Sequence, residues 1–406
     1  MIIKKYKEIF ISVIIIFIIV CGYAIKYTLI DKHYTNIENK ETSEEKIIDN
    51  NISVDKEIIN EEEIKLSMQK GERFVKLGNI AVYANDYDEC VYIFNFKDKS
   101  IKNLYKTENG IDKIYFDGEY IYILPYYYRG KGIMKVDLKG NSSKIYEGSS
   151  IQMWLQDEKI YFVEQIGYDQ INGTPQGNLS VMNKDGSDKK VLTDNEEQAI
   201  TNDLIENVKN YFYIVNYNIY YIDQSSRSIY CSKIDGTERK EIAKGRNYIT
   251  SANENYLTYL DYSDGEKHHV IFLNNEENKE VGRFGNVYCL SNEGYIYTRK
   301  TLGNNSNIED EYTLYKINYS DNTLDSIWKN EVPLEFLSYI YKNYAYFRGG
   351  SEFYRVDLQD GKSKEKIDVG YSYFINGKAY SIKSNEGIIT ELEILNLDDM
   401  KKETIK

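Results

Sequence analysis

The sequence contains little proline, histidine, cysteine or tryptophan. Its 406 residues include 3 prolines, 3 histidines, 4 cysteines and 2 tryptophans. Because proline lacks a backbone donor, this scarcity favours extended β-ladders. The cysteines form no CxxC pair and no metal-ligand spacing, so the sequence indicates neither a zinc site nor a disulfide framework. No Walker, Rossmann, GxSxG or HExxH motif is present, and we therefore assign no catalytic residue, no metal and no cofactor.

Stripes of lysine and arginine are also missing. The chain carries a net charge of −13. Nucleic-acid binding depends on neutralising phosphates with clustered basic residues, so this class of function is excluded. Hydrophobic residues make up 42% of the chain and include 41 tyrosines, which is enough to build a core.

What the sequence does contain is a motif that returns eight times. The clearest copies are LSVMNKDGSDKKVL at Leu179–Leu192 and IYCSKIDGTERKEI at Ile229–Ile242. Each reads as an alternating strand, a tight polar turn and a second short strand. The other copies begin at Val91, Ile133, Val270, Leu314, Phe353 and Leu392. A period of about 40 to 45 residues with several short strands is typical of a β-propeller.

Two further strands precede each motif copy. The second strand of each unit is aromatic and alternating, as in NIYYI at Asn218–Ile222, and a shorter apolar stretch comes before it. These aromatic strands begin at Ile80, Tyr120, Lys159, Asn218, Tyr256, Tyr295, Tyr344 and Lys378. The sequence therefore predicts an all-β propeller of four-stranded blades. The spacing favours eight blades over seven, and seven would require the copy at Val270 to be spurious. Both end units supply all their own strands, so no strand exchange between the termini is expected.

The repeat unit resembles a known family. Asn218–Ile222 with Ile229–Ile242, and Lys159–Val163 with Leu179–Leu192, are similar to a bacterial propeller family of unknown function. That family is built like the YWTD propeller of low-density-lipoprotein receptors. The resemblance covers about residues 72–406 and implies a fold and an exported or membrane-attached setting, but no reaction. A literal YWTD tetrad is absent, so no receptor residue is carried over.

The N-terminus has the pattern of a membrane anchor. Three lysines precede an apolar run of 17 residues, Ile9–Ile25, at the short end of what spans a bilayer. Lysines before the run keep the N-terminus in the cytoplasm, so the rest of the chain is expected outside. A signal-peptidase site before Ile25 and a lipid anchor at Cys21 are the alternatives, and both place the propeller on the same side.

The chain therefore divides into four predicted segments. Residues 1–8 form a short cytoplasmic tail and residues 9–25 a single transmembrane signal anchor. Residues 26–71 are rich in Glu, Asn and Lys and read as an acidic flexible spacer, because they cannot bury enough apolar surface to fold. A short helix near its end is the alternative to a stalk. Residues 72–406 form the propeller.

Candidate binding residues come from the loops between the second and third strands of the blades. Loops on a rigid scaffold carry most binding residues. In the second blade, Tyr126, Tyr127, Tyr128 and Arg129 combine large amphipathic rings with a planar cation that recognises carboxylates. Tyr168 lies in the long stretch Glu164–Asn178 of the third blade and is a fifth ligand-binding candidate. The alternative for the tyrosines is that their rings cover the edge of a blade.

These observations favour a non-catalytic binding or scaffold module on the extracytoplasmic side of the cell membrane. Its expected partner is a protein, a peptide or a cell-wall glycan. A propeller enzyme acting on carbohydrate, either a hydrolase or a lyase, is the first alternative. A sensor domain of an envelope assembly is the second. The ligand and the oligomeric state do not follow from the sequence.

Overall fold

The computed structural model describes residues 61–406, with short gaps. The gaps are residues 127–129, 169–174, 194–199, 202–210, 224, 246, 264–266, 284–285, 291–293, 303–308, 319, 331–335, 350–351, 360–363 and 386. No helix among the described residues is long and apolar enough to cross a membrane. The predicted anchor at residues 9–25 and most of the predicted spacer lie outside the described residues.

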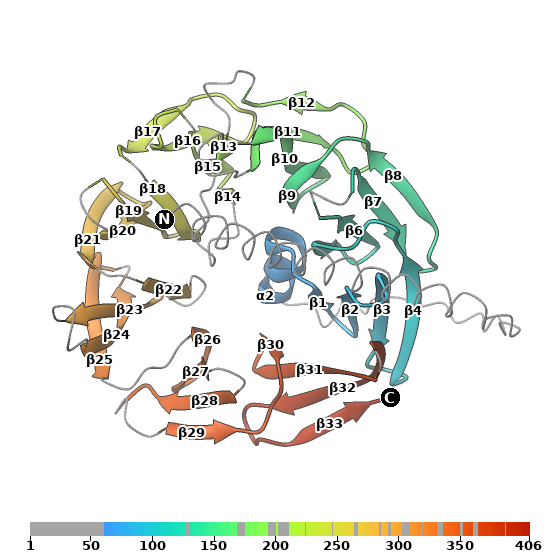
Figure 1. Ribbon diagram of the computed structural model, residues 1–406. Coiled ribbons are helices and arrows are strands. Elements are labelled where there is room, and N and C mark those ends of the chain that lie inside the picture. The colour runs from blue at the N-terminus through green and yellow to red at the C-terminus, as the bar shows by residue number, and fades with distance from the viewer. Residues whose placement is uncertain are drawn as a thin grey trace, which may run out of the picture. The chain divides into compact units, whose positions relative to one another are not determined.

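Residues 74–405 form eight antiparallel sheets arranged as the blades of a propeller (Figure 1). The eight sheets follow one another along the chain. Within each four-stranded sheet, every strand pairs with the next one in the sequence. Blades 1 to 4 consist of β1 (Phe74–Leu77), β2 (Ile80–Asn85), β3 (Cys90–Asn95), β4 (Ser100–Lys106); β5 (Lys113–Phe116), β6 (Tyr120–Leu124), β7 (Ile133–Asp137), β8 (Ser142–Tyr146); β9 (Ser150–Gln156), β10 (Lys159–Tyr168), β11 (Pro175–Asn183), β12 (Lys190–Val191); β14 (Phe212–Val215), β15 (Asn218–Ile222), β16 (Ile229–Lys233) and β17 (Lys240–Ala243). A short extra strand, β13 (Ile200–Thr201), pairs with β11 in blade 3.

Blades 5 to 8 repeat the pattern. They consist of β18 (Asn247–Ala252), β19 (Tyr256–Asp261), β20 (Lys267–Phe272), β21 (Glu277–Arg283); β22 (Asn286–Leu290), β23 (Tyr295–Leu302), β24 (Glu309–Asn318), β25 (Thr323–Asn330); β26 (Phe336–Tyr341), β27 (Tyr344–Gly349), β28 (Glu352–Asp357), β29 (Lys364–Ile367); β30 (Ser372–Ile375), β31 (Lys378–Asn385), β32 (Ile388–Asn396) and β33 (Lys402–Ile405). The prediction of eight four-stranded blades is confirmed. The motif copy that begins at Val270 belongs to a complete blade, since Val270 lies in β20 of blade 5.

The core lies between the blades. Each sheet packs its apolar face on the next one, and buried clusters join blades 1 and 2, 2 and 3, 3 to 5, 5 and 6, 6 and 7, 7 and 8, and 8 and 1. Tyrosines from the first two strands of the blades fill these seams, because their rings bury a large area. The fully buried ones are Tyr115, Tyr122, Tyr221, Tyr256, Tyr297, Tyr346 and Tyr380.

The ring closes by side-chain packing between blades 8 and 1. Each of these blades has its own four strands, which confirms that the termini exchange none. At the seam, Phe74 stacks on Tyr373 with ring centroids 5.1 Å apart. Asn85 donates from Nδ2 to the carbonyl of Gly387 at 2.7 Å. The last strand, β33, comes beside β4 at the outer edge (Figure 1).

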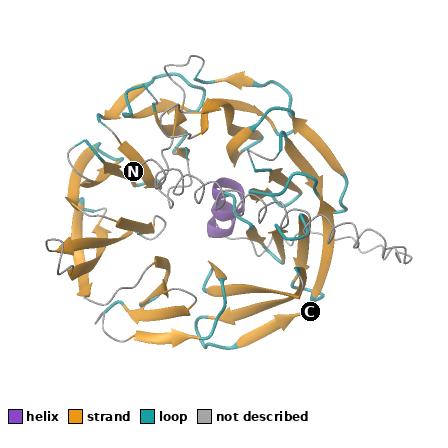
Figure 2. Ribbon diagram, in the orientation of Figure 1, coloured by secondary structure: helices purple, strands orange, loops and turns teal. Residues whose placement is uncertain are grey.

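The described residues contain one helical segment, which lies at the centre of the ring (Figure 2). It consists of the α-helical turn α2 (Glu61–Ile64) and the π-helical turn η2 (Lys65–Lys70), together called the channel helix. The helix packs on β1, β5 and β9, the innermost strands of blades 1 to 3. A short helix near the end of residues 26–71, the alternative to a stalk, is thus present at residues 61–70. Leu66 and Met68 pack against buried clusters of the ring, which gives this short segment the burial that an isolated helix lacks.

Candidate functional site

Tyr126, a predicted binding residue, is tied into a cluster between two blades. Its hydroxyl donates to Asp86 Oδ2 at 2.8 Å and also contacts the guanidinium of Arg73. Arg73 pairs with Asp86 and lies 5.6 Å from the centroid of the Tyr126 ring. Because Arg73 and Asp86 flank strands of blade 1 and Tyr126 follows β6 of blade 2, the cluster joins these blades. The ligand-binding role of Tyr126 stays a prediction.

The structure describes only one of the other four candidates, Tyr168. Tyr127, Tyr128 and Arg129 lie outside the described residues. Tyr168 is the last residue of β10, half exposed and paired in register with Pro175 of β11. The predicted loop Glu164–Asn178 is thus largely an extension of the β10–β11 hairpin, with a bulge between Gln165 and Gly167. Tyr126 and Tyr168 belong to hairpins of different blades.

A pocket of about 710 Å³ lies at the opposite end of the blades, between the channel helix and the innermost strands of blades 3, 4 and 5. It includes the turns that join the first and second strands of these blades, here called the A–B turns. Its lining mixes rings, amides, carboxylates and ammonium groups with apolar side chains. The blades contribute Trp154, Leu155, Gln156, Asp157, Tyr213, Ile214, Val215, Asn216, Tyr217, Ala252, Asn253 and Glu254, and the helix contributes Glu62, Ile64, Lys65, Met68, Gln69 and Lys70.

The wall formed by blades 3 and 4 is held by a buried glutamine. The side chain of Gln152 is fully buried and belongs to β9. Its Nε2 donates to the carbonyl of Phe212 at 3.0 Å, and its Oε1 accepts from the backbone N–H groups of Phe212 and Tyr211. Because one amide satisfies both donor and acceptor groups of β14, the two innermost strands are locked side by side.

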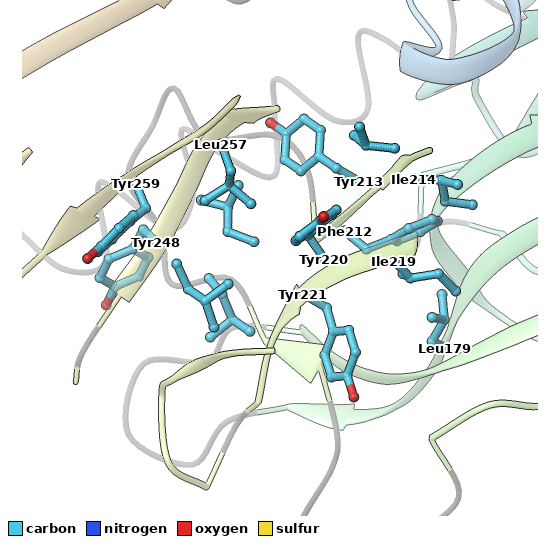
Figure 3. Packing of buried hydrophobic residues seen from close by; sticks show 14 of the residues in the cluster. Leu179, Phe212, Tyr213, Ile214, Ile219, Tyr220, Tyr221, Tyr248, Leu257 and Tyr259 are labelled. Atoms are coloured by element: carbon cyan, nitrogen blue, oxygen red, sulfur yellow. The ribbon is translucent and has the colours of Figure 1, made fainter. Parts of the chain in front are cut away.

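Two buried rings extend this wall. Trp154 is 4% exposed and contacts Tyr213 edge-on with ring centroids 6.4 Å apart. Tyr213 donates its hydroxyl to the carbonyl of Thr250 at 3.1 Å, so that it spans from β14 to β18 of blade 5. Figure 3 shows Tyr213 turned toward the strands of blade 5 while Ile214 and Ile219 lie on the side of blade 3. Hydrogen bonds and ring contacts therefore join three blades on this side of the pocket.

The channel helix forms the other wall and is attached to blades on three sides. Glu63 is buried and pairs with Lys76 of β1 at 2.5 Å. Glu62 accepts a hydrogen bond from the hydroxyl of Tyr339, on β26 of blade 7, at 3.3 Å. Lys65 pairs with Glu254, in the A–B turn of blade 5, at 3.4 Å. The last contact lies directly on the rim of the pocket.

Two ionisable side chains of the helix have perturbed pKa values. Burial raises the pKa of Glu62, although hydrogen bonds from the Asn376 backbone and the Tyr339 hydroxyl and the charge of Lys70 oppose it. Burial also lowers the pKa of Lys70, against the charges of Glu72 and Glu62. Both shifts favour the neutral forms. Groups shifted in this way are enriched at functional sites.

The arrangement is suited to binding a molecule of moderate size with several polar groups. Amides and carboxylates of the lining supply donors and acceptors, and the rings supply apolar faces. Among the described residues, no group of three His, Cys, Asp or Glu side chains is placed to hold a metal ion. Loop length, which is the signal behind the predicted binding residues, does not reveal this pocket. The A–B turns are short, with two residues in blades 3 and 4, and they meet only in the ring.

The fold defines the protein as an eight-bladed β-propeller with a helix in its channel and a pocket beside that helix. No protein-family model and no curated protein matches the chain. The resemblance to a bacterial propeller family therefore stays a prediction.

Solved structures resemble the chain at low sequence identity. Dipeptidyl peptidase 4 of Porphyromonas gingivalis is similar with a TM-score of 0.55 and 11% identity, over 88% of this chain. This chain spans only 62% of the length of that peptidase. An oligogalacturonate lyase from Vibrio parahaemolyticus has a TM-score of 0.42 at 11% identity, over 83% of this chain and 91% of the lyase. A chain of the nidogen/laminin complex has a TM-score of 0.31 at 14% identity, over 61% of this chain and 91% of that one. At 11% identity the likeness to the peptidase is one of fold alone.

Proposed function

We propose that this protein is a non-catalytic binding module that receives a peptide, a segment of a protein or a cell-wall glycan in the pocket beside the channel helix. The observation that carries the proposal is the pocket itself, with about 710 Å³ of space and a lining of rings, amides and charged groups. Concave sites with a few placed polar groups are where proteins bind small ligands.

The walls of the pocket support this role because they are held in place before any ligand arrives. Gln152 fixes β9 to β14, and the Tyr213 hydroxyl fixes β14 to β18. Lys65 also links the helix to the A–B turn of blade 5 through its ion pair with Glu254. A preorganised site loses little conformational entropy on binding, so more of the contact energy appears as affinity.

We also propose that the module is held at the cell membrane by Ile9–Ile25, with the propeller outside. The run of apolar residues and the lysines before it support this orientation. Protease added to intact cells should degrade the propeller of the full chain. Protection of the propeller until the cells are lysed would contradict the orientation.

The binding role is tested by a thermal-shift screen of the full chain with peptides, muropeptides and neutral oligosaccharides. A ligand at 100 times its Kd stabilises the folded state by about 2.7 kcal/mol. Gln156→Trp is the pocket-filling variant, because this side chain lines the pocket and makes no hydrogen bond within the described part of the chain. The shift is expected to disappear in this variant.

The matched control is Ile166→Trp. Ile166 is 47% exposed and lies on β10 of the same blade, about 20 Å from the A–B turn at the strand's other end. It should keep the full ligand shift. Equal shifts in both variants would place the ligand elsewhere and contradict the proposal.

A carbohydrate-active enzyme is the second candidate. The observation in its favour is that three carboxylates, Glu62, Asp157 and Glu254, line one pocket and that burial raises the pKa of Glu62. Paired carboxylates with pKa values held apart are the machinery of glycoside hydrolysis. Chromatography of each oligosaccharide after incubation with the protein distinguishes the two candidates. Products that vanish with Glu62→Gln would favour the enzyme, and intact ligand would favour the binding module.

A further inference from the structure

The A–B turn of blade 4 has an unusual residue at its second position. The turn consists of Asn216 and Tyr217, with φ angles of 49° and 58°. A two-residue hairpin with both φ angles positive strongly prefers Asn followed by Gly. The equivalent turn of blade 8 follows that rule, since it consists of Asn376 and Gly377 with φ angles of 53° and 69°. Tyrosine thus stands in blade 4 where glycine stands in blade 8.

Folding does not explain this tyrosine. A bulky side chain at positive φ is an outlier, because its Cβ crowds the backbone. The side chain is 59% exposed, whereas Tyr213, Tyr220 and Tyr221 of the same blade are buried. Its hydroxyl makes no hydrogen bond within the described residues. A strained residue that adds nothing to the core points to a role at a site.

The site is the pocket, whose rim Tyr217 occupies. The turn is held against blade 5, because its first residue, Asn216, donates from Nδ2 to the backbone carbonyl of Glu254 at 3.0 Å. Glu254 in turn pairs with Lys65 of the channel helix. The exposed ring is therefore presented by a held turn beside the polar part of the lining.

The chemistry of the lining indicates the class of ligand. Amides at Gln156 and Gln69 offer both donors and acceptors. Three carboxylates and two lysines line the same space, so their charges nearly balance. A strongly acidic or basic ligand would meet like charges, whereas a ligand with many hydroxyl groups would find partners throughout. A sugar ring also carries an apolar face that fits an exposed aromatic ring.

We propose that the pocket binds an uncharged oligosaccharide, with one sugar ring stacked on Tyr217 and the hydroxyl groups of its neighbours bonded to the amides and carboxylates. This inference rests on the proposed function and names its ligand class. The strain in the turn is retained because the ring serves the ligand. A peptide is the competing outcome, and the experiment separates the two.

The test measures the affinity of the full chain for cellotetraose, maltotetraose and chitotetraose by calorimetry. Tyr217→Gly removes the ring and suits the turn, so the melting temperature should stay the same or rise. The affinity for the bound sugar should fall about tenfold or more, as expected for the loss of a stacked ring. Tyr217→Phe keeps the ring and should bind within about threefold of the natural protein. The control Tyr371→Ala removes another exposed tyrosine, 62% exposed, which precedes β30 and lies at the end of that strand away from its A–B turn. This variant should leave the affinity unchanged.

Each outcome decides something. Loss of affinity in the Gly variant alone supports the proposal. Sugar binding that Tyr217→Gly leaves intact overturns the stacking. If none of the sugars binds but a peptide does, and Gln156→Trp blocks that peptide, the ligand class is overturned and the binding module stands. If no ligand in the screen responds to Gln156→Trp, the proposed function fails as well.

Discussion

The attachment of the channel helix to blade 1 depends on a buried ion pair. Glu63 and Lys76 are 1% and 11% exposed, and their charged groups lie 2.5 Å apart. Glu63 Oε2 also accepts from the backbone N–H of Gly78 at 2.8 Å, while Lys76 donates to the Gly78 carbonyl at 2.8 Å. These contacts join the helix to the A–B turn of blade 1. We predict that Glu63→Gln releases the helix.

The burial of the two side chains sets the magnitude. Removing one partner of a buried pair costs about 3–5 kcal/mol, because the remaining charge stays uncompensated. The glutamine amide still accepts from Gly78, and Lys76 retains a little exposure, so the lower end, about 3 kcal/mol, is expected. Lys76→Met in the same background removes the orphaned charge. The double variant should therefore be more stable than the sum of the single changes implies.

The assay is urea unfolding, combined with hydrogen exchange of residues 62–72. Glu63→Gln should lower the midpoint and speed the exchange of the helix. The matched control is Glu403→Gln, which breaks the exposed pair of Glu403 with Lys99 between blades 8 and 1. Those side chains are 54% and 61% exposed, so the control should cost less than about 1 kcal/mol. Equal losses in the two variants, with unchanged helix exchange, would refute the reasoning.

Three further predictions concern the ring. Burial is the main cause that lowers the pKa of His268 to about 3, and the charge of His269 is the second. The imidazole of His268 therefore stays neutral in the folded state. In the unfolded chain it takes up a proton below its ordinary pKa of 6.5. The free energy of unfolding should therefore fall by about 2 kcal/mol from pH 7 to pH 5. Urea unfolding at several pH values should show a smaller fall in His268→Gln than in the natural protein. An equal fall in the two proteins would contradict this prediction. Gly377→Ala should destabilise the fold by about 1–3 kcal/mol, because Gly377 has φ 69° and an added Cβ would lie 2.4 Å from the Tyr341 ring; an unchanged melting temperature would show that the turn adapts. Tyr126→Phe should lower stability by about 1 kcal/mol, since it removes the hydroxyl bonded to Asp86, and should leave ligand affinity unchanged; lost affinity at full stability would restore a ligand role for Tyr126.

The strands followed from the sequence because their determinants are local. The aromatic strands begin where predicted, as at Asn218 for β15 and Lys378 for β31. The turns at Asp185–Gly186 and Asp235–Gly236 also form as expected, with φ 89° and 87° at the glycines. Alternation and turn chemistry act within a few residues, so each repeat carries its own instructions.

The site did not follow, because it is assembled from distant segments. In the sequence, Glu63 is one of several acidic residues in a stretch predicted to be flexible. Only the structure shows that it contacts Lys76 and Gly78. The π-helical turn η2 is likewise stabilised by packing on three blades, which no local pattern encodes. The role of Tyr217 could not be predicted either, because here the local sequence preference points to another residue. Local preference favours glycine at its position in the turn, so only the structure shows that a tyrosine adopts positive φ there.

The pocket has one wall on the helix and one on the blades, which makes binding and helix attachment dependent on each other. A ligand that touches both Lys65 and Tyr217 stabilises the attached helix, and by reciprocity a loosened helix weakens the ligand. Hydrogen exchange of residues 62–70 should therefore slow when the ligand is added. Glu63→Gln lies outside the pocket lining, yet it should reduce affinity about fivefold or more, while Glu403→Gln should not. Full affinity in Glu63→Gln, with helix exchange unaffected by ligand, would mean that the ligand binds to the blades alone.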